Sequence, residues 1–375
     1  METGDFLARY WQRRPCLIRR AIPGFEPLLS REELFTLSTR DTVESRLVLE
    51  RGGEAPWQVV PGPLDAEDLQ SLPDSHWTLL VQNVDLHRPE AAALLRRFGF
   101  IPHWRMDDLM ISVAPEGGSV GPHLDSYDVF LLQAQGRRRW QIHPDGYTEA
   151  DFIPGLDLRI LADFRPQQEW VLEPGDMLYL PPGVAHHGVA LDECQTYSIG
   201  FRAPSRHELL NLYLDDMLAA RPDERYADPG LVQQEFGAEI TAAALSRIRA
   251  LLKALFEVDA ALDRWFGRHI TRLPDQIEIA PPAPLDRAAF AALCRSARAL
   301  RCHHACRMAF FPGAGGLLLY VNGGEYPLPG DSLDFVTALT EARQLNREQL
   351  GRYAATPATA QVLNDLYNRG LLHGD

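Results

Sequence analysis

The chain has few of the features that mark secreted or membrane-spanning proteins. It has 5 cysteines, an odd number that are mostly far apart, which is typical of a reducing cytoplasm and excludes a disulfide framework. No apolar run approaches the ~20 residues that a bilayer span requires. The opening residues, Met-Glu-Thr-Gly-Asp-Phe, have neither the basic nor the apolar region of a signal peptide. We therefore expect a soluble, cytoplasmic protein with no membrane partner.

Positive charge is also scarce. Lys and Arg number 37 against 51 Asp and Glu, for a formal net charge of −14. An acidic surface repels phosphate backbones and favours basic partners, so direct nucleic-acid binding is disfavoured. Hydrophobic residues make up 46% of the 375 residues, enough for packed cores in two or three domains.

Metal-binding cysteines are nearly absent. The segment Cys302–Cys306, Cys-His-His-Ala-Cys, resembles half of a zinc site, but no second pair of ligands follows it. Structural zinc needs four ligands, so we interpret these residues as structural.

Residues 100–203 consist of short segments separated by Gly, Pro and Asp turns. Many short strands joined by such turns are typical of a jelly roll or double-stranded β-helix, which can hold a ligand inside it. The predicted strands are Leu109–Ala114, Val129–Gln133, Arg137–His143, Gln168–Leu172, Asp176–Leu180, His187–Leu191 and Thr196–Phe201.

The regions on either side of these strands have different patterns. Residues 1–95 are expected to pack on the core as short helices and strands, including a helix at Asp5–Trp11 and a capping box that begins at Ser30. In residues 205–272 the period becomes helical, with a helix at Arg206–Ala219. A second, long amphipathic helix is predicted from Ile240, Ala244, Ile248, Leu251, Leu252 and Leu255.

The two helices cannot bury their own apolar stripes, so we expect this segment to form a homodimer. The proline-rich residues 273–284 read as a linker. Residues 285–375 combine a strand pair near Gly316–Val321 and Glu325–Leu328 with helices, which is typical of a winged-helix-like domain. The predicted helices begin at Asp286 and cover Asp331–Leu339 and Ala358–Asn368. The predicted fold is therefore mixed α+β: a double-stranded β-helix core at 96–204, a helical dimerisation segment and a C-terminal winged-helix-like domain.

One motif in the predicted core carries chemistry. His123 and Asp125 lie two residues apart, and in a strand such residues point to the same side. With a second histidine they would form the 2-His-1-carboxylate set of non-heme Fe(II) oxygenases. His186 and His187 follow Pro-Pro-Gly downstream. Neighbouring strand residues face opposite ways, so only one can point inward, and the spacing favours His186.

A basic strand follows the motif. Gly136-Arg-Arg-Arg-Trp140 puts Arg138 and Trp140 on one face. A buried guanidinium needs an anion, and a carboxylate suits it well because two parallel hydrogen bonds can form. A 2-oxoacid could hold the metal at one end and Arg138 at the other, and its oxidative decarboxylation with O2 would give succinate. Zinc or a non-catalytic cupin metal would use similar ligands, so these residues alone leave the redox chemistry open.

These residues together resemble the bacterial JmjC-type ribosomal oxygenases of the cupin superfamily. The resemblance rests on Asp107–Ser112, Gly121–Phe130, Gly136–Trp140, Leu180–His186 and Tyr197–Pro204, with further likeness at Tyr10–Arg19 and Leu363–Gly370. It implies a JmjC core, a helical dimerisation segment and a winged helix. It also implies an Fe(II)- and 2-oxoglutarate-dependent hydroxylase that modifies the β-carbon of an arginine in large-subunit ribosomal protein sixteen.

The resemblance also suggests residue roles. His123, Asp125 and His186 match the iron ligands, which are also the catalytic residues, while Arg138 and Ser112 match contacts to 2-oxoglutarate. For the substrate, Asp107 or Asp108 could hold a guanidinium by a bidentate pair, and Tyr127 could line the groove. A solvated turn and a packed aromatic explain these three residues equally well.

Two alternative functions stay open. Related animal enzymes hydroxylate histidine, and N-methyl-lysine demethylation uses the same chemistry. A protein of another class, a non-catalytic metal-binding cupin with a nucleic-acid-binding winged helix, would bind DNA or RNA with steep salt dependence. The net charge of −14 argues against that alternative.

Overall fold

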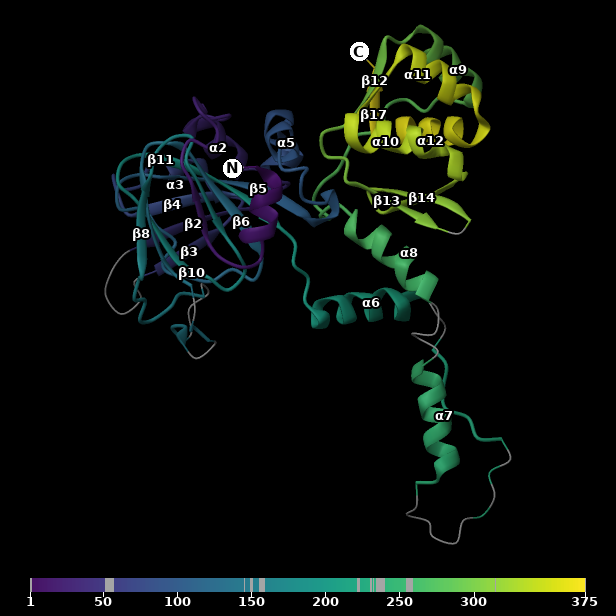
Figure 1. Cartoon of the computed structure of the whole chain (residues 1–375), viewed down its shortest axis with the longest axis horizontal. Helices are drawn as coiled ribbons and strands as arrows, with labels where there is room; N and C mark the ends of the chain where they lie inside the picture. Colours follow the sequence, from purple (N-terminus) through teal and green to yellow (C-terminus); the bar gives the residue numbers. More distant parts are fainter. Residues whose placement is uncertain are drawn as a thin grey trace. The chain divides into compact units, whose positions relative to one another are not determined.

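The computed structural model describes residues 2–374 apart from 51–56, 145, 149–150, 155–158, 221–222, 230, 232, 234–239, 254–258 and 314. The chain divides into two compact units, and Figure 1 labels the helices and strands along the chain. The first contains residues 1–203, 273–306 and 337–375, and the second contains 204–272 and 307–336. Among the described helices, none combines the length and apolar character needed to cross a bilayer.

The first unit is built on a large antiparallel sheet of eight strands in the order β1-β9-β6-β11-β5-β4-β2-β3. Its central strands are nearly all buried because both of its faces are covered. The strands are β1 (Cys16–Ile18), β2 (Ser45–Glu50), β3 (Trp57–Pro61), β4 (Trp77–Val81), β5 (Met106–Ala114), β6 (Asp128–Gln135), β9 (Met177–Leu180) and β11 (Cys194–Phe201).

A smaller sheet of three strands supplies the other wall of the core. Its order is β10-β7-β8, with bounds Ala185–Ala190, Arg138–His143 and Gln168–Leu172. In β7, alternate residues are buried, so Arg138, Trp140 and Ile142 face inward. Inward residues of β6, β7 and β9 form one apolar cluster that includes Val129, Trp140 and Leu178. All seven predicted core strands are present, within a few residues of the expected bounds.

Residues 1–95 do more than pack on the core, because their strands join its main sheet. β4 pairs with β5 in the middle of the sheet, and β2 and β3 extend it beyond. Neither β2 nor β3 was predicted from the sequence. Short helices cover the remaining apolar surface: α1 (Thr3–Arg9), α2 (Arg31–Ser38), α3 (Ala66–Gln70), α4 (Val84–His87), α5 (Pro89–Arg96) and the 3-10 turn η1 (His103–Arg105).

The capping box at the start of α2 forms as predicted. The Ser30 hydroxyl accepts from the Glu33 backbone N–H, and the Glu33 carboxylate accepts from the Ser30 backbone N–H. The first predicted helix ends at Arg9 rather than at Trp11, because Trp11 turns away to pack on Tyr179 and Phe201.

The C-terminal part of the first unit is a small helical layer on a three-stranded sheet. The sheet order is β16-β12-β17, with bounds Gln344–Asn346, Ala299–Cys302 and Leu372–Gly374. The helices are α9 (Arg287–Ser296), α11 (Arg347–Ala355) and α12 (Pro357–Asn368). Asp286 caps α9 by accepting from the Ala289 N–H, so the helix begins where the sequence predicted.

The second unit contains long helices and a β-meander. The helices are α6 (Arg206–Ala220), α7 (Ala242–Lys253) and α8 (Asp259–Ile270), and the sheet order is β13-β14-β15, with bounds Met308–Gly313, Gly316–Val321 and Gly324–Leu328. The long helix predicted from Ile240 to Leu255 corresponds to α7, which is described over Ala242–Lys253. Leu255 lies outside the described residues.

The helix predicted over 331–339 is three short pieces: η3 (Gly330–Ser332), α10 (Leu333–Thr337) and the π-helical η4 (Ala338–Ala342). η4 ends at Arg343 in the left-handed region (φ 54°).

Candidate metal centre and its cavity

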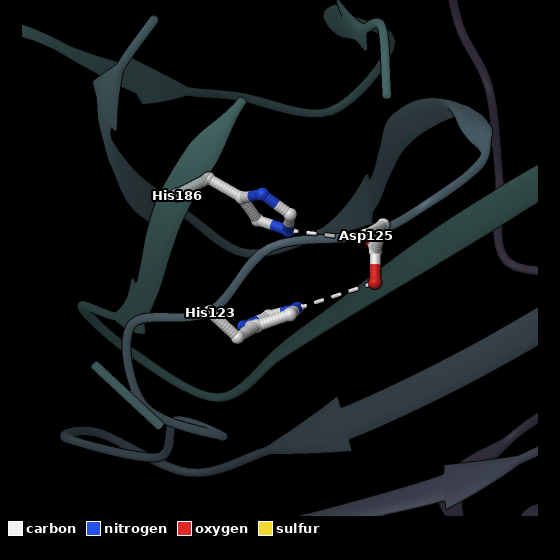
Figure 2. Close-up of side chains that lie close together, drawn as sticks. All are labelled: His123, Asp125 and His186. Carbon is white, nitrogen blue, oxygen red and sulfur yellow. Dashed lines mark ion pairs between the residues drawn. The ribbon is translucent and has the colours of Figure 1, made fainter. Parts of the chain in front are cut away.

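Three side chains from two separate segments converge on one point. His123 and Asp125 lie in the loop between β5 and β6, and His186 lies on β10. One ligand atom from each lies within 4.8 Å of the others, and in the described parts of the chain this is the sole group of three His, Cys, Asp or Glu with that geometry. Figure 2 shows both imidazoles directed at the Asp125 carboxylate.

The loop reaches this arrangement without a strand, contrary to the sequence prediction for His123 and Asp125. His123 pairs with His186 through an isolated β-bridge, with N···O distances of 3.0 and 2.9 Å. Gly121 has φ +79°, and Pro122 has no N–H to donate, so a ladder cannot continue through them. The bridge therefore aligns the two histidines, where the prediction relied on strand alternation.

The backbone also orients both rings. Nδ1 of His123 lies 2.9 Å from the Gly121 carbonyl, and Nδ1 of His186 lies 2.9 Å from the Val184 carbonyl. Because a carbonyl can only accept, each Nδ1 carries the proton and each Nε2 lone pair faces Asp125. The Nε2 atoms lie 3.9 and 3.6 Å from the carboxylate oxygens, too long for good hydrogen bonds.

Burial keeps His186 neutral. It lowers the pKa of His186 to about 4, an effect that neighbouring His123 reinforces and Asp125 opposes. A neutral imidazole is the form that ligates a metal. Together the three groups offer two nitrogen donors and one carboxylate, the donor set that suits non-heme iron.

His187 points to the opposite side of β10 from His186. Its ring lies edge-on against Phe164, with 6.1 Å between centroids. Burial and nearby positive groups also lower the pKa of His187 to about 4, so a lowered pKa does not distinguish the two histidines. Position does, because His186 alone belongs to the converging group.

The three residues form part of the wall of a cavity of about 280 Å³ between the two sheets. The large sheet contributes Met110, Ser112, Thr196 and Ser198, and the small sheet contributes Arg138 and Trp140. Ser112 is buried and its hydroxyl donates to the Thr196 carbonyl at 3.2 Å. The predicted co-substrate contacts, Arg138 and Ser112, therefore face the same cavity as the three converging residues.

Arg138 is the most unusual of these residues. Its side chain is 5% exposed, yet Nε and Nη2 have no hydrogen-bond partner among the described residues. The indole N–H of Trp140 is likewise buried without a partner in that part of the chain. Buried donors cost free energy unless an acceptor meets them. The cavity therefore presents unpaired N–H groups to an anion.

Trp140 lies between Arg138 and the metal-binding end of the cavity. Trp140 of β7 pairs with Gly188 of β10. On either side of this pair, Arg138 lies opposite Ala190 and Ile142 lies opposite His186. Gly188 is required there, because a Cβ would lie 2.7 Å from the indole ring. The sequence analysis noted Trp140 only as a companion of Arg138.

Tyr127 stands at the outer end of the cavity, 36% exposed. Burial, followed by the Asp125 and Asp108 carboxylates, raises the pKa of its hydroxyl above the ordinary value. The Asp108 carboxylate also accepts from the Asn83 N–H at 3.1 Å. Asp107 forms an ion pair with Arg202 at 2.9 Å. Asp108 thus lies nearer the cavity than Asp107, although neither is among its lining residues.

Arg46 lines the cavity from β2 and was missed by the sequence analysis. On that strand Arg46 and Val48 lie on the cavity side and alternate with Leu47 and Leu49, which lie on the other side. The strand itself was not predicted, so the arginine had no face assigned to it.

Comparison with known proteins identifies the family. The sequence matches a JmjC domain model over residues 93–209, a ROXA-like winged helix over 247–373 and an AraC-like ligand binding domain over 165–264. It is 39% identical over 281 residues to the ribosomal protein uL16 3-hydroxylase of Escherichia coli K12, covering 75% of this chain and 74% of that protein. The chain belongs to the JmjC-type ribosomal oxygenases.

Solved structures with the same fold match this chain over its whole length. Structures of the E. coli ribosomal oxygenase YcfD superpose with TM-scores of 0.87 and 0.84, at 33% identity, and cover 100% of this chain and 98% of YcfD. The second of these holds cobalt and 2-oxoglutarate. A more distant relative is the lysine-specific demethylase and histidyl-hydroxylase NO66 of Aedes aegypti, 24% identical over 68% of this chain and 44% of NO66.

Proposed function

We propose that this ribosomal oxygenase uses Fe(II), 2-oxoglutarate and O2 to hydroxylate the β-carbon of an arginine in ribosomal protein uL16. The observation that carries the proposal is the convergence of His123, Asp125 and His186 at one end of a cavity that Arg138 also lines, with its Nε and Nη2 unpaired among the described residues. The E. coli relative is named a uL16 3-hydroxylase, and position 3 of an amino acid is its β-carbon.

The metal would be held by Nε2 of both histidines and by the Asp125 carboxylate. When bound, Fe(II) with O2 and 2-oxoglutarate supplies the oxidising power to hydroxylate an unactivated C–H bond. The chain's own part is to fix the donors in advance: main-chain carbonyls hold the rings, and burial keeps His186 unprotonated. His186 therefore does not have to lose a proton before the metal enters.

The co-substrate's far carboxylate would pair with Arg138. Nε and Nη2 are adjacent donors on one guanidinium edge, which matches the two oxygens of a carboxylate. Ser112 and the indole N–H of Trp140 lie along the same cavity. The near end of 2-oxoglutarate would then face His123, Asp125 and His186.

The substrate arginine would enter past Tyr127. The ring of Tyr127 offers a face for a guanidinium, and the nearby Asp108 carboxylate offers a counter-charge. The Asp108 carboxylate acts on the Tyr127 hydroxyl, which makes Asp108 the better candidate of the two acids. The net charge of −14 favours a basic ribosomal protein.

The test is 2-oxoglutarate turnover to succinate, with and without recombinant uL16, in wild type and His123→Ala. We expect turnover that rises with uL16 and is lost in the variant, with one oxygen added to an arginine in the product peptide. Bound metal with no turnover under any condition would contradict the proposal and favour a binding protein.

A second candidate is histidyl hydroxylation, which the likeness to NO66 supports. The same mass spectra separate the two, because the added oxygen would lie on a histidine. N-methyl-lysine demethylation, the other activity in that relative's name, would instead remove a methyl group from a lysine.

We further propose that the helical segment forms a homodimer in the cytoplasm. The second unit leaves large apolar side chains exposed on α6, α7 and α8: Leu210, Leu212, Leu218, Leu245, Ile248, Leu252 and Leu262. Apolar patches of this kind mark protein interfaces. The C-terminal elements are proposed to support protein contacts, with no role in binding nucleic acid.

A further inference from the structure

Arg46 is a second arginine in the cavity wall without a partner. It is half-buried on β2, and its side chain makes no hydrogen bond or ion pair with the residues that the structure describes. Tyr127 lines the same cavity. A guanidinium with five donors therefore lines the cavity, and no described residue accepts a hydrogen bond from it.

The register of the large sheet places Arg46 in the same cross-strand row as Ser112, one of the proposed co-substrate contacts. Arg46 pairs with Leu80, Leu80 with Ser112, and Ser112 with Thr196, so the four form one row across four strands. At about 4.8 Å between strands, Arg46 starts roughly 10 Å from Ser112. Arg138 is deeply buried on the facing sheet, whereas Arg46 is partly exposed beside Tyr127. Arg46 thus belongs to the outer, substrate side.

We propose that Arg46 binds the main chain of the protein substrate by donating to a carbonyl oxygen of the hydroxylated residue or of its neighbour. The inference rests on the proposed function. In β-carbon hydroxylation the reacting carbon is bonded directly to Cα, so the main chain must enter the mouth of the cavity with it. Its carbonyl groups lose water there and need donors.

Other acceptors fit Arg46 less well. The co-substrate carboxylate already has Arg138, which lies deeper and has two free donors. An acidic side chain would be an uncommon feature of a basic ribosomal target. A main-chain carbonyl is present in every peptide, so Arg46 would set the depth and register of the chain while Tyr127 and Asp108 select the side chain.

The experiment compares wild type with Arg46→Met, Arg46→Lys and, as a matched control, Arg97→Met on the exposed end of α5. The substrate is a uL16 peptide that spans the modified arginine, made as an amide and as an analogue with an ester at the peptide bond after that arginine. An ester carbonyl is the weaker acceptor. KM is measured for peptide and 2-oxoglutarate, together with succinate formed per hydroxylated peptide.

In Arg46→Met we expect the peptide KM to rise about ten- to hundred-fold, the loss typical of a charged hydrogen bond. The 2-oxoglutarate KM should change less than twofold, succinate should exceed product, and the ester should weaken wild type more than the variant. Arg46→Lys should fall between. A peptide KM within twofold of wild type would overturn the proposal, as would a rise in the 2-oxoglutarate KM instead.

Failure of the proposed function gives a different pattern. If wild type does not hydroxylate the peptide, Arg46 is judged by binding alone, from the anisotropy of dye-labelled peptide. Weaker binding in Arg46→Met than in Arg97→Met would support the role of Arg46, and equal binding would overturn it.

Discussion

Arg138 is buried, yet Nε and Nη2 of its guanidinium have no hydrogen-bond partner in the described part of the chain. Such a residue weakens the protein that carries it, because an unpaired buried charge is costly. Its retention makes sense if an anion joins it in the working enzyme. The cavity thus has Arg138 donors for a carboxylate at one end. At the other end it has the Asp125 carboxylate and the imidazoles of His123 and His186.

Arg138→Met should therefore weaken 2-oxoglutarate binding while leaving the fold at least as stable. We expect the Kd to rise about ten- to hundred-fold, from the loss of a charged hydrogen bond, and the thermal midpoint to hold or increase. Calorimetric titration with the metal-loaded protein measures the first. Arg137→Met is the control, because Arg137 is exposed and pairs with Asp192. Equal Kd values in the two variants would contradict the role of Arg138.

His186 and His187 provide a comparison between adjacent residues of one type. His186→Ala should abolish stable metal binding, and His187→Ala should retain it, because only His186 lies beside His123 and Asp125. Co(II) titration followed by visible absorption distinguishes them. Loss of binding in His187→Ala alone would reverse the assignment.

At the scale of elements, the sequence predicted the core strands because buried strands carry long apolar runs and clear turns between them. It did not predict β2 and β3, whose place in the sheet depends on β4, a distant partner. Motif and resemblance predicted His123, Asp125, His186, Arg138 and Ser112 as site residues, and these five line one cavity. Arg46 could not be found in that way, since its role depends on which strand it joins and which face it occupies. The bridge between His123 and His186 is likewise a tertiary pairing that local alternation does not contain.

A substitution at Gly188 on β10 would test whether the close contact between this strand and the Trp140 indole fixes the position of the ring. Gly188→Ala would put a Cβ 2.7 Å from the indole, so the ring must shift toward the cavity. We expect a stability loss of about 1–3 kcal/mol from overpacking, altered Trp fluorescence and weaker 2-oxoglutarate binding. Gly351→Ala in α11 is the control, because its Cβ would meet nothing within 4 Å. Unchanged 2-oxoglutarate affinity in Gly188→Ala would show that the indole does not flank the co-substrate.

The segment after β12 should make stability depend on pH. Burial, followed by His304 and His373, lowers the pKa of His303 to about 4, below the ordinary value of about 6.5. Between these values the unfolded chain binds a proton that the folded chain does not, so stability falls as pH drops from about 6.5 to 4.

His303→Asn keeps an acceptor for the Ala305 N–H and should lose less stability over that range than wild type or the exposed control His207→Asn. Urea unfolding at pH 7 and pH 5 measures the difference. Parallel losses in all three proteins would show that His303 does not contribute.

At the scale of the whole molecule, the exposed leucines of the second unit predict a dimer, which sedimentation and cross-linking through a lysine can detect. The sequence has a single lysine, Lys253, at the end of α7. We expect sedimentation to give twice the 42.1 kDa chain mass, and Leu218→Glu with Leu252→Glu to give the monomer. Lys253→Arg should sharply reduce amine-reactive cross-linking without changing the mass. A wild-type monomer at micromolar concentration would contradict the proposal.

The bridge between His123 and His186 has a consequence for how the cell matures this protein. Main-chain hydrogen bonds hold the two segments together, and carbonyls turn the rings. The site is therefore assembled by folding itself, with iron needed only afterwards. Iron starvation should leave a reservoir of finished, inactive enzyme that regains activity within one binding step when the metal returns, with no new synthesis.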